Sequence, residues 1–207
     1  VWLDLGSVPR TGSQHPGMTA TNPDLQSSKE ETPVSTNSSA QRSETFTWID
    51  PAIALEQLPR LSGLDYFSGL RDGSIAPPPI ASLMNFDLVD ARYGHVEFQC
   101  WPGEAHYNPL GMVHGGLACT LLDTALGCAA HTTLEAGIGY TSIDLAVKYL
   151  RPITLQKGAL RAEGSVVKTG PRVIFTEGRL STADGKLLAT ATSTLLIFPH
   201  QPGALTT

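Results

Sequence analysis

The chain has 207 residues, of which 41% are hydrophobic and 16% are charged, and its formal net charge is -5. This balance is typical of one globular domain of ordinary size. It excludes a global basic surface of the kind that binds nucleic acid, although local basic clusters could still hold phosphates.

The three cysteines, Cys100, Cys119 and Cys128, lie in apolar surroundings, are odd in number and form no CxxC pair. They are therefore interpreted as small buried hydrophobic residues in a reducing compartment, not as a disulfide or zinc framework. The longest apolar run, residues 117–130, is too short to span a membrane and is interrupted by Asp123. The first residues lack the features of a secretory signal. We expect a cytoplasmic protein that binds neither a membrane nor a metal ion.

Residues 1–45 are rich in Ser, Thr, Pro, Asn and Gln and poor in large apolar groups. Such a segment cannot bury enough apolar surface to offset the entropy that it would lose on ordering. The sequence therefore predicts a disordered tail over residues 1–45, one folded domain over residues 46–200, and a frayed tail over residues 201–207.

Three short helices are predicted at the start of the domain. Asp50 and the proline after it form a favourable N-cap and first helical position, which predicts a helix over residues 52–58 that Pro59 stops. An apolar stripe at helical spacing predicts a second helix over residues 63–71. A brief helical turn is expected over residues 80–84, after a run of three prolines.

Further along, the spacing of apolar residues changes to that of strands. Val96, Phe98 and Cys100 alternate with polar residues, which predicts a strand with one apolar face. A turn at residues 90–94 is expected to lead into this strand and to make either a hairpin or a bent strand. Four more strands are expected, and an Asp-Gly turn joins the last two. These four cover residues 142–149, 160–167, 173–181 and 186–198.

Residues 115–133 form a long apolar segment between the first strand and the other four. Apolar side chains cover nearly all of its helical surface, so we expect a buried helix that the sheet wraps around. The predicted fold class is α+β, with one antiparallel sheet, including a four-stranded meander, around one central helix.

The stretch from His106 to Asp123 concentrates the reactive groups. Its first half is a loop with two histidines, Asn108 and three glycines, and its second half starts a helix at Gly115 and Gly116. Free N–H groups and the helix dipole at such a start favour an oxyanion, and the lack of a Cβ lets a substrate approach. A carboxylate in an apolar helix is costly unless it is paired or used, and burial should raise the pKa of Asp123 and make it a better base.

The spacing of these residues resembles that of the PaaI-like acyl-CoA thioesterases, a family with the hotdog fold. Six positions separate Asn108 from His114 and nine separate His114 from Asp123, as in that family. The family also has segments that are similar to residues 140–145, 149–152 and 170–172 of this chain. The resemblance covers about residues 60–198. It implies an antiparallel β-sheet wrapped around a long central α-helix, and hydrolysis of an acyl-CoA thioester to a free acid and CoA.

The resemblance also implies roles for single residues. The Gly115 N–H would hold the thioester oxygen, with Gly116 beside it, and Asp123 would act as general base or as nucleophile. Asn108 would line the site and hold the carbonyl or the attacking water. His114 would orient Asn108 or the substrate.

Two residues of the next strand are alternatives for holding the attacking water beside Asp123. Ser142 and Thr141 point to opposite faces of that strand, and we favour Ser142. His106 is interpreted as a loop residue.

No cofactor is expected, because coenzyme A is part of the substrate. The phosphates of coenzyme A are expected to bind basic side chains at the edge of the site. These basic side chains could equally be ordinary solvated residues at the edges of the sheet. The candidates are Arg151, Lys168 and Arg172.

The spacing of Gly115 and Asp123 adds a conclusion about assembly. They are eight positions apart on one helix, which at ~1.5 Å rise per residue places them roughly 12 Å apart. One thioester cannot readily be held by Gly115 and attacked from Asp123 of the same chain. We therefore expect an obligate homodimer with shared sites, which agrees with the back-to-back dimers of the family, and further association into a dimer of dimers.

Two other functions fit the same fold. A hotdog enoyl-CoA hydratase or dehydratase also uses a histidine and a carboxylate, but in other loop and helix contexts, and it would release no free thiol. A non-catalytic acyl-CoA-binding protein should lack Asp123 or carry an added pair of DNA-binding helices. The acyl specificity is left open.

Overall fold

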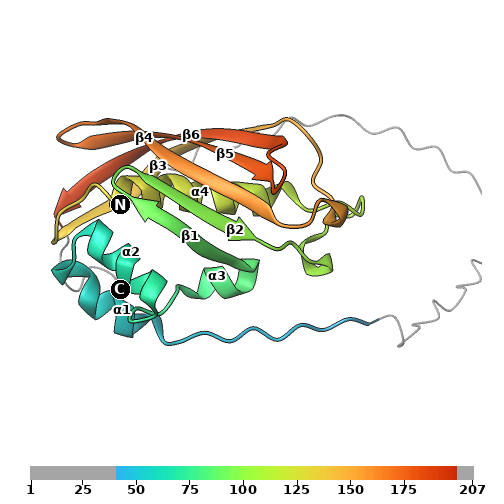
Figure 1. Cartoon of the computed structure of the whole chain (residues 1–207), viewed down its shortest axis with the longest axis horizontal. Coiled ribbons are helices and arrows are strands. Elements are labelled where there is room, and N and C mark those ends of the chain that lie inside the picture. The colour runs from blue at the N-terminus through green and yellow to red at the C-terminus, as the bar shows by residue number, and fades with distance from the viewer. Residues whose placement is uncertain (1–40, 200–207) are drawn as a thin grey trace, which may run out of the picture. The chain divides into compact units, whose positions relative to one another are not determined.

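A computed structural model describes residues 41–199 of the chain. The frayed tail predicted for residues 201–207, and most of the disordered tail predicted for residues 1–45, lie outside these residues. The described part contains helices, short 3-10 turns and one six-stranded sheet (Figure 1).

Two of the short N-terminal helices begin at side-chain caps. Helix α1 (Pro51–Gln57) starts where the Asp50 carboxylate accepts a hydrogen bond from the Ala52 N–H at 2.9 Å. Helix α2 (Gly63–Asp72) starts at Ser62, whose Oγ accepts from the Asp65 N–H at 3.2 Å. The predicted helices are thus confirmed. The 3-10 turn η2 (Leu58–Arg60) and helix α3 (Pro79–Met84) complete this region. The prediction that Pro59 stops the helical path is wrong, because the chain continues from α1 into η2. Pro59 lies in the first turn of η2, where a proline is tolerated.

All neighbouring strands of the sheet are antiparallel, in the order β1-β2-β4-β5-β6-β3. The strands are β1 (Phe86–Arg92), β2 (His95–Cys100), β3 (Ile138–Tyr149), β4 (Leu160–Thr169), β5 (Val173–Thr182) and β6 (Leu187–Pro199). The 3-10 turns η3 (Glu104–His106) and η4 (Leu155–Lys157) lie in the connections.

The predicted four-stranded meander is wrong in one respect, because β3 pairs with β6 and not with β4. Helix α4 (Gly115–His131) runs along one face of the sheet and delivers the chain to the far edge, where β3 forms. The segment after β3 then returns past the start of α4, where the Val113 N–H donates to the Ile153 carbonyl at 3.0 Å. Only β4, β5 and β6 form a consecutive meander. The chain therefore has the antiparallel sheet and central helix of the hotdog fold.

Helix α4 packs against five of the six strands and carries much of the core. Its leucines are buried, as are the apolar faces of β2 and β4 that meet the helix. The expectation of burial all round is wrong, however. One side of the helix, with Cys119, Asp123 and Thr124, is exposed or half-buried in the single chain. Of the three cysteines, only Cys100 is fully buried, and burial raises the pKa of its thiol to about 12.

An irregularity in β3 decides which of its side chains face the helix. The register shifts between Ser142 and Asp144, so the alternation expected from Ile143 to Tyr149 is broken. At this bulge Ile143 is 57% exposed, whereas Leu145 is half-buried against the core. The bulge leaves Ser142 on the helix side of the strand, which is relevant to the site described below.

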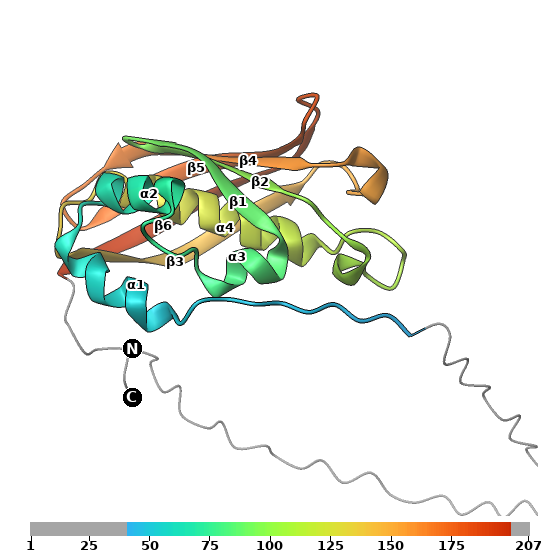
Figure 2. The ribbon, with the colours of Figure 1, turned by 60° about the horizontal axis from the view of Figure 1, so that its bottom comes forward.

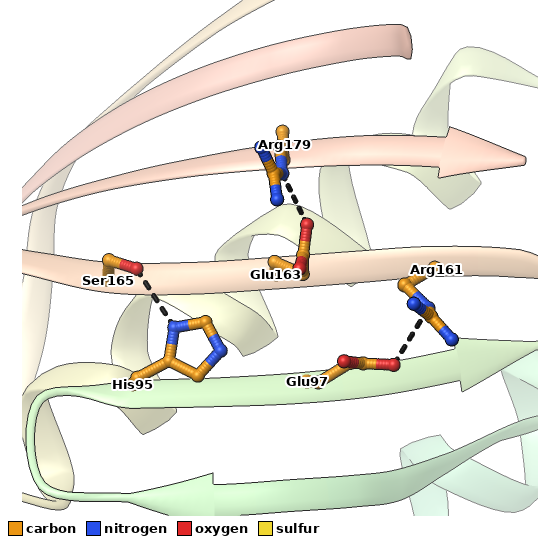
Figure 3. A network of polar contacts seen from close by, with 6 residues as sticks. All are labelled: His95, Glu97, Arg161, Glu163, Ser165 and Arg179. Carbon is orange, nitrogen blue, oxygen red and sulfur yellow. Dashed lines mark hydrogen bonds and ion pairs between the residues drawn. The ribbon is translucent and has the colours of Figure 1, made fainter. Parts of the chain in front are cut away.

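The outer face of the sheet, away from α4, is polar and carries a network of paired charges (Figure 3). A hollow of about 520 Å³ lies on this face. The Arg179 guanidinium beside Glu163 holds the pKa of that carboxyl below its usual value. Exposed pairs of this kind contribute little stability. The contacts in the network are Arg161 to Glu97 at 2.8 Å, Arg179 to Glu163, and His95 Nδ1 to Ser165 Oγ at 3.0 Å.

Glycine at position 164 lets α4 lie directly on the sheet. A Cβ on Gly164 would lie 2.2 Å from the carbonyl oxygen of Ala125, an atom of the helix backbone that cannot move alone. We predict that Gly164→Ala lowers the free energy of unfolding by about 3 kcal/mol, and the Tm by roughly 10 °C. Gly103→Ala is the matched control, because its Cβ would meet only a side-chain atom at 3.9 Å. Thermal unfolding measures both, and equal Tm values would contradict the packing described here.

Candidate active site

The start of α4 leaves one backbone N–H group without a partner among the described residues, that of Gly115. His114 is the N-cap, and its Nδ1 accepts a hydrogen bond from the Gly116 N–H at 2.8 Å. The next N–H, of Leu117, donates to the His114 carbonyl at 3.0 Å. Of the two glycines proposed as donors from the sequence, only Gly115 is therefore available to a ligand. The His114 ring caps the helix, and the hydrogen bonds of the Asn108 side-chain oxygen go to backbone N–H groups of its own loop instead of to His114.

Asn108 shapes the loop that leads into the helix. Its Oδ1 accepts hydrogen bonds from the N–H groups of Leu110 and Met112, at 2.9 and 3.1 Å. His106 also serves the loop, as expected, because its Nδ1 accepts from the Gly103 N–H at 2.9 Å. The Asn108 side-chain oxygen is thus occupied, and its Nδ2 is the group that remains to donate to a substrate carbonyl.

Tyr149, at the end of β3, stands over the start of the helix. Its hydroxyl donates to the Gly115 carbonyl oxygen at 3.1 Å and lies 2.8 Å from Cys119 Sγ. A Cβ on Gly115 would come within 3.1 Å of the Tyr149 ring. The hydrogen bond with Cys119, and then burial, raise the pKa of Tyr149 to about 12, so its hydroxyl stays protonated and able to donate. Tyr149 thus holds the peptide group that follows the free N–H, and its ring lies against Gly115.

The sequence did not single out Tyr149 as a functional residue. The order of the elements nevertheless contains a signal, because a strand that follows a helix and runs antiparallel to it returns to the start of that helix. The last residue of β3, Tyr149, therefore comes close to Gly115.

Asp123 lies two turns further along α4 and is exposed in the single chain. The expectation that its own chain buries it is therefore wrong. Its Oδ1 accepts a hydrogen bond from Ser142 Oγ at 3.1 Å. Thr141 lies on the opposite face of β3, where its backbone pairs with Leu196. Of the two alternatives for a residue beside Asp123, the structure brings only Ser142 to it.

A shallow cleft of about 320 Å³ opens beside Gly115. It is lined by the loop before α4 and by the segment that follows β3, including Asn108, Tyr149 and Arg151. The Arg151 guanidinium donates to the Leu187 carbonyl at 2.6 Å, which holds the side chain at this end of the sheet. The free N–H of Gly115, an amide and a cation thus share one cleft.

Lys168 and Arg172 lie at the other end of the sheet, where the Arg172 carbonyl accepts from the Ile197 N–H at 3.0 Å. Leu187, which holds Arg151, is ten positions from Ile197 on β6, or about 33 Å. The three cations proposed to bind the CoA phosphates therefore do not form one cluster within a chain.

The described residues contain no group of three or more His, Cys, Asp or Glu side chains placed to hold a metal ion. Within residues 41–199, no helix is long and apolar enough to cross a membrane. The reactive groups that the structure does provide are the Gly115 N–H and the Asp123–Ser142 pair. Gly115 and Asp123 lie on one helix but eight positions apart, which is roughly 12 Å.

The fold and this helix define a hotdog-fold protein of the thioesterase type, and the comparisons with known proteins agree. The sequence pattern of the thioesterase superfamily matches residues 110–189. Human acyl-coenzyme A thioesterase 13 is 35% identical over 103 residues, which are 49% of this chain and 72% of that protein. The chain belongs to the thioesterase superfamily, and it is a homologue of acyl-CoA thioesterases.

Two solved structures extend the comparison. A phenylacetic acid degradation-related protein from Ralstonia eutropha JMP134 is 32% identical, with a TM-score of 0.59 over 63% of this chain and 98% of its own. A protein of Streptococcus mutans UA159, solved with acetyl CoA bound, is 25% identical, with a TM-score of 0.51 over 56% of this chain and 91% of its own. Among the curated relatives, the chain spans from 43% to 72% of their lengths. The similarity to the PaaI-like family seen in the sequence is thus confirmed.

Proposed function

We propose that this protein is an acyl-CoA thioesterase, which hydrolyses an acyl-CoA to a free acid and CoA at sites shared between two subunits. The observation that carries the proposal is the placement of one unpaired N–H, that of Gly115, and one carboxylate, that of Asp123, on the same helix. The first can hold an oxyanion and the second can take a proton from water. The relatives named above support the same reaction class.

In the proposed reaction, Asp123 removes a proton from water, and the water oxygen attacks the thioester carbon. The carbonyl oxygen takes up negative charge and is held by the Gly115 N–H of the other subunit. The carbon–sulfur bond then breaks, and the proton held by Asp123 passes to the departing thiolate, giving CoA thiol and the free acid. Ser142 orients the carboxylate, and Tyr149 holds the Gly115 carbonyl, in the peptide group that follows the donor N–H.

Two features support a site made by two copies. The separation of Gly115 and Asp123 along α4 is too long for one carbonyl group to meet both in one chain. In addition, β3 is an edge strand, and the side of α4 next to it is exposed. An exposed edge strand presents unpaired N–H and C=O groups with which another chain can pair. Burial of Asp123 under that chain would supply the apolar surroundings that its own chain does not.

The positions of the cations fit this arrangement. Arg151 lies in the Gly115 cleft of one copy, and Lys168 and Arg172 lie toward the other end of the sheet. A site that combines opposite ends of two copies could therefore use both sets for the CoA phosphates.

Gly115→Pro tests the donor. Proline removes the N–H at the first helical position, which tolerates it, and the extended backbone of His114 before it is compatible. Gly115→Ala is the matched control, because it also adds a Cβ against Tyr149 but keeps the N–H. We predict that kcat for thiol release from acyl-CoA falls about 10²-fold further in the proline variant than in the alanine variant. Equal kcat values would show that the N–H has no part in the reaction.

Asp123→Asn tests the base. The amide keeps the shape of the side chain but cannot take a proton, so kcat should fall about 10²- to 10⁴-fold while the Tm changes little. Glu177→Gln, on the outer face of the sheet, is the control and should keep full activity. An unchanged kcat for thiol release by Asp123→Asn would contradict the role of Asp123 as the base. Hydration of an enoyl-CoA without any thiol release would favour the hydratase instead.

A further inference from the structure

The first segment of the domain, named here the N-terminal arm (residues 46–58), exposes large apolar side chains. Trp48 is 61% exposed, Ile49 and Ile53 are each 55% exposed, and Leu55 is 42% exposed. Helix α1, within this arm, has seven residues and buries none of them. Short helices owe most of their stability to tertiary packing, and exposed apolar patches mark interaction sites. The arm is therefore expected to pack against another surface.

The arm lies beside the first residues of the edge strand β3. The carbonyl oxygen of Pro59, the residue that follows the arm, is 3.9 Å from the position that a Cβ on Gly137 would take, and β3 begins at Ile138. Figure 2 shows α1 on the same side of the sheet as α4. Because β3 is the edge that the proposed dimer covers, the exposed surface of the arm is continuous with the proposed interface.

The two-fold symmetry of a shared site decides what faces this end of β3. Within one chain, Tyr149 contacts Gly115 and Ser142 contacts Asp123, each through a hydrogen bond of 3.1 Å. If Gly115 of one copy meets Asp123 of the other, the Tyr149 end of one β3 lies near Ser142 of the other β3. By the same symmetry, the start of one β3 lies across from residues 150–153 of the other copy, which line its Gly115 cleft.

The surface around that cleft is apolar, as is the arm. Leu110, in the loop before α4, is 78% exposed, and Leu150, in the wall of the cleft, is 48% exposed. The arm itself contains two acidic residues, Asp50 and Glu56, and no basic residue. Anionic membrane surfaces attract basic segments, so the composition of the arm favours an apolar protein surface over a membrane.

We infer that the N-terminal arm of one subunit packs on the Gly115 cleft of the other subunit and forms the outer wall of the shared site. The inference rests on the proposed function, in which two subunits share each site, and adds a second segment that the partner contributes. In the single chain the cleft is shallow, with a volume of about 320 Å³. Apolar side chains laid over it would exclude water, which strengthens the hydrogen bond from the Gly115 N–H to an oxyanion. The arm precedes residues 110–189, where the superfamily pattern matches, so this wall is not part of that pattern.

Cross-linking with a short bismaleimide tests this placement in the variant Ile53→Cys/Leu150→Cys. The two positions lie at opposite ends of β3, which has twelve residues and spans about 40 Å, so no short linker joins them within one chain. We expect a covalent dimer on a denaturing gel. The single variants Ile53→Cys and Leu150→Cys are the matched controls, which also account for the native cysteines, and should give no more covalent dimer than the wild type. No covalent dimer from the double variant would overturn the inference, and so would one from Ile53→Cys alone, which would place arm against arm.

The substitution Ile53→Asp tests the effect of the arm on the reaction. A charge in the apolar contact should lower kcat/KM for thiol release from acyl-CoA about tenfold or more. Val89→Asp is the matched control, because Val89 is 41% exposed on β1, at the opposite edge of the sheet, and this variant should keep the wild-type value.

An Ile53→Asp variant as active as Val89→Asp would overturn the inference. So would binding of the wild type to phosphatidylserine vesicles that Ile53→Asp abolishes, which would assign the arm to a membrane surface. A wild type that releases no thiol from any acyl-CoA but still gives the cross-link would instead contradict the proposed reaction and leave the placement of the arm intact.

Discussion

The close contact of α4 with the sheet is the constraint on which the rest of the structure depends. At Gly164 the helix backbone comes so near to β4 that no side chain fits between them. A helix held in this way cannot bend or shift, so the residues along it keep fixed distances from one another. The Gly115 N–H and the Asp123 carboxylate are therefore held apart, and no rearrangement within the folded chain can bring them to one carbonyl group.

The same contact explains why the helix is buried unevenly. The sheet covers the stripe that includes Leu121, Ala125 and Leu126, and it leaves the opposite side to solvent. That opposite side carries Cys119, Asp123 and Thr124, and it lies between β3 and the short N-terminal helices. A carboxylate on such a surface is well placed to meet groups from another chain.

Much of this could be predicted from the sequence, because the signals were local. Periodicity located α4 and every strand of the sheet except β1, which overlaps the turn predicted at residues 90–94. N-cap residues located the starts of α1 and α2, and the spacing from Asn108 to Asp123 indicated the family. What could not be predicted depends on contacts distant in sequence. The pairing of β3 with β6, the bulge beside Ser142 and the hydrogen bond from Tyr149 to Gly115 all follow from the path of the chain around α4. The capping role of His114 was within reach, since the residue before a helical Gly-Gly is an N-cap position.

The central claim is that one subunit supplies Gly115 and another supplies Asp123 to each site. The most direct test mixes the inactive variants Gly115→Pro and Asp123→Asn in equal amounts, after dissociation and reassociation. Half of the dimers are then mixed, and each mixed dimer has one intact site of two, so the mixture should recover about a quarter of the wild-type activity. A mixture no more active than either variant alone would contradict the shared site.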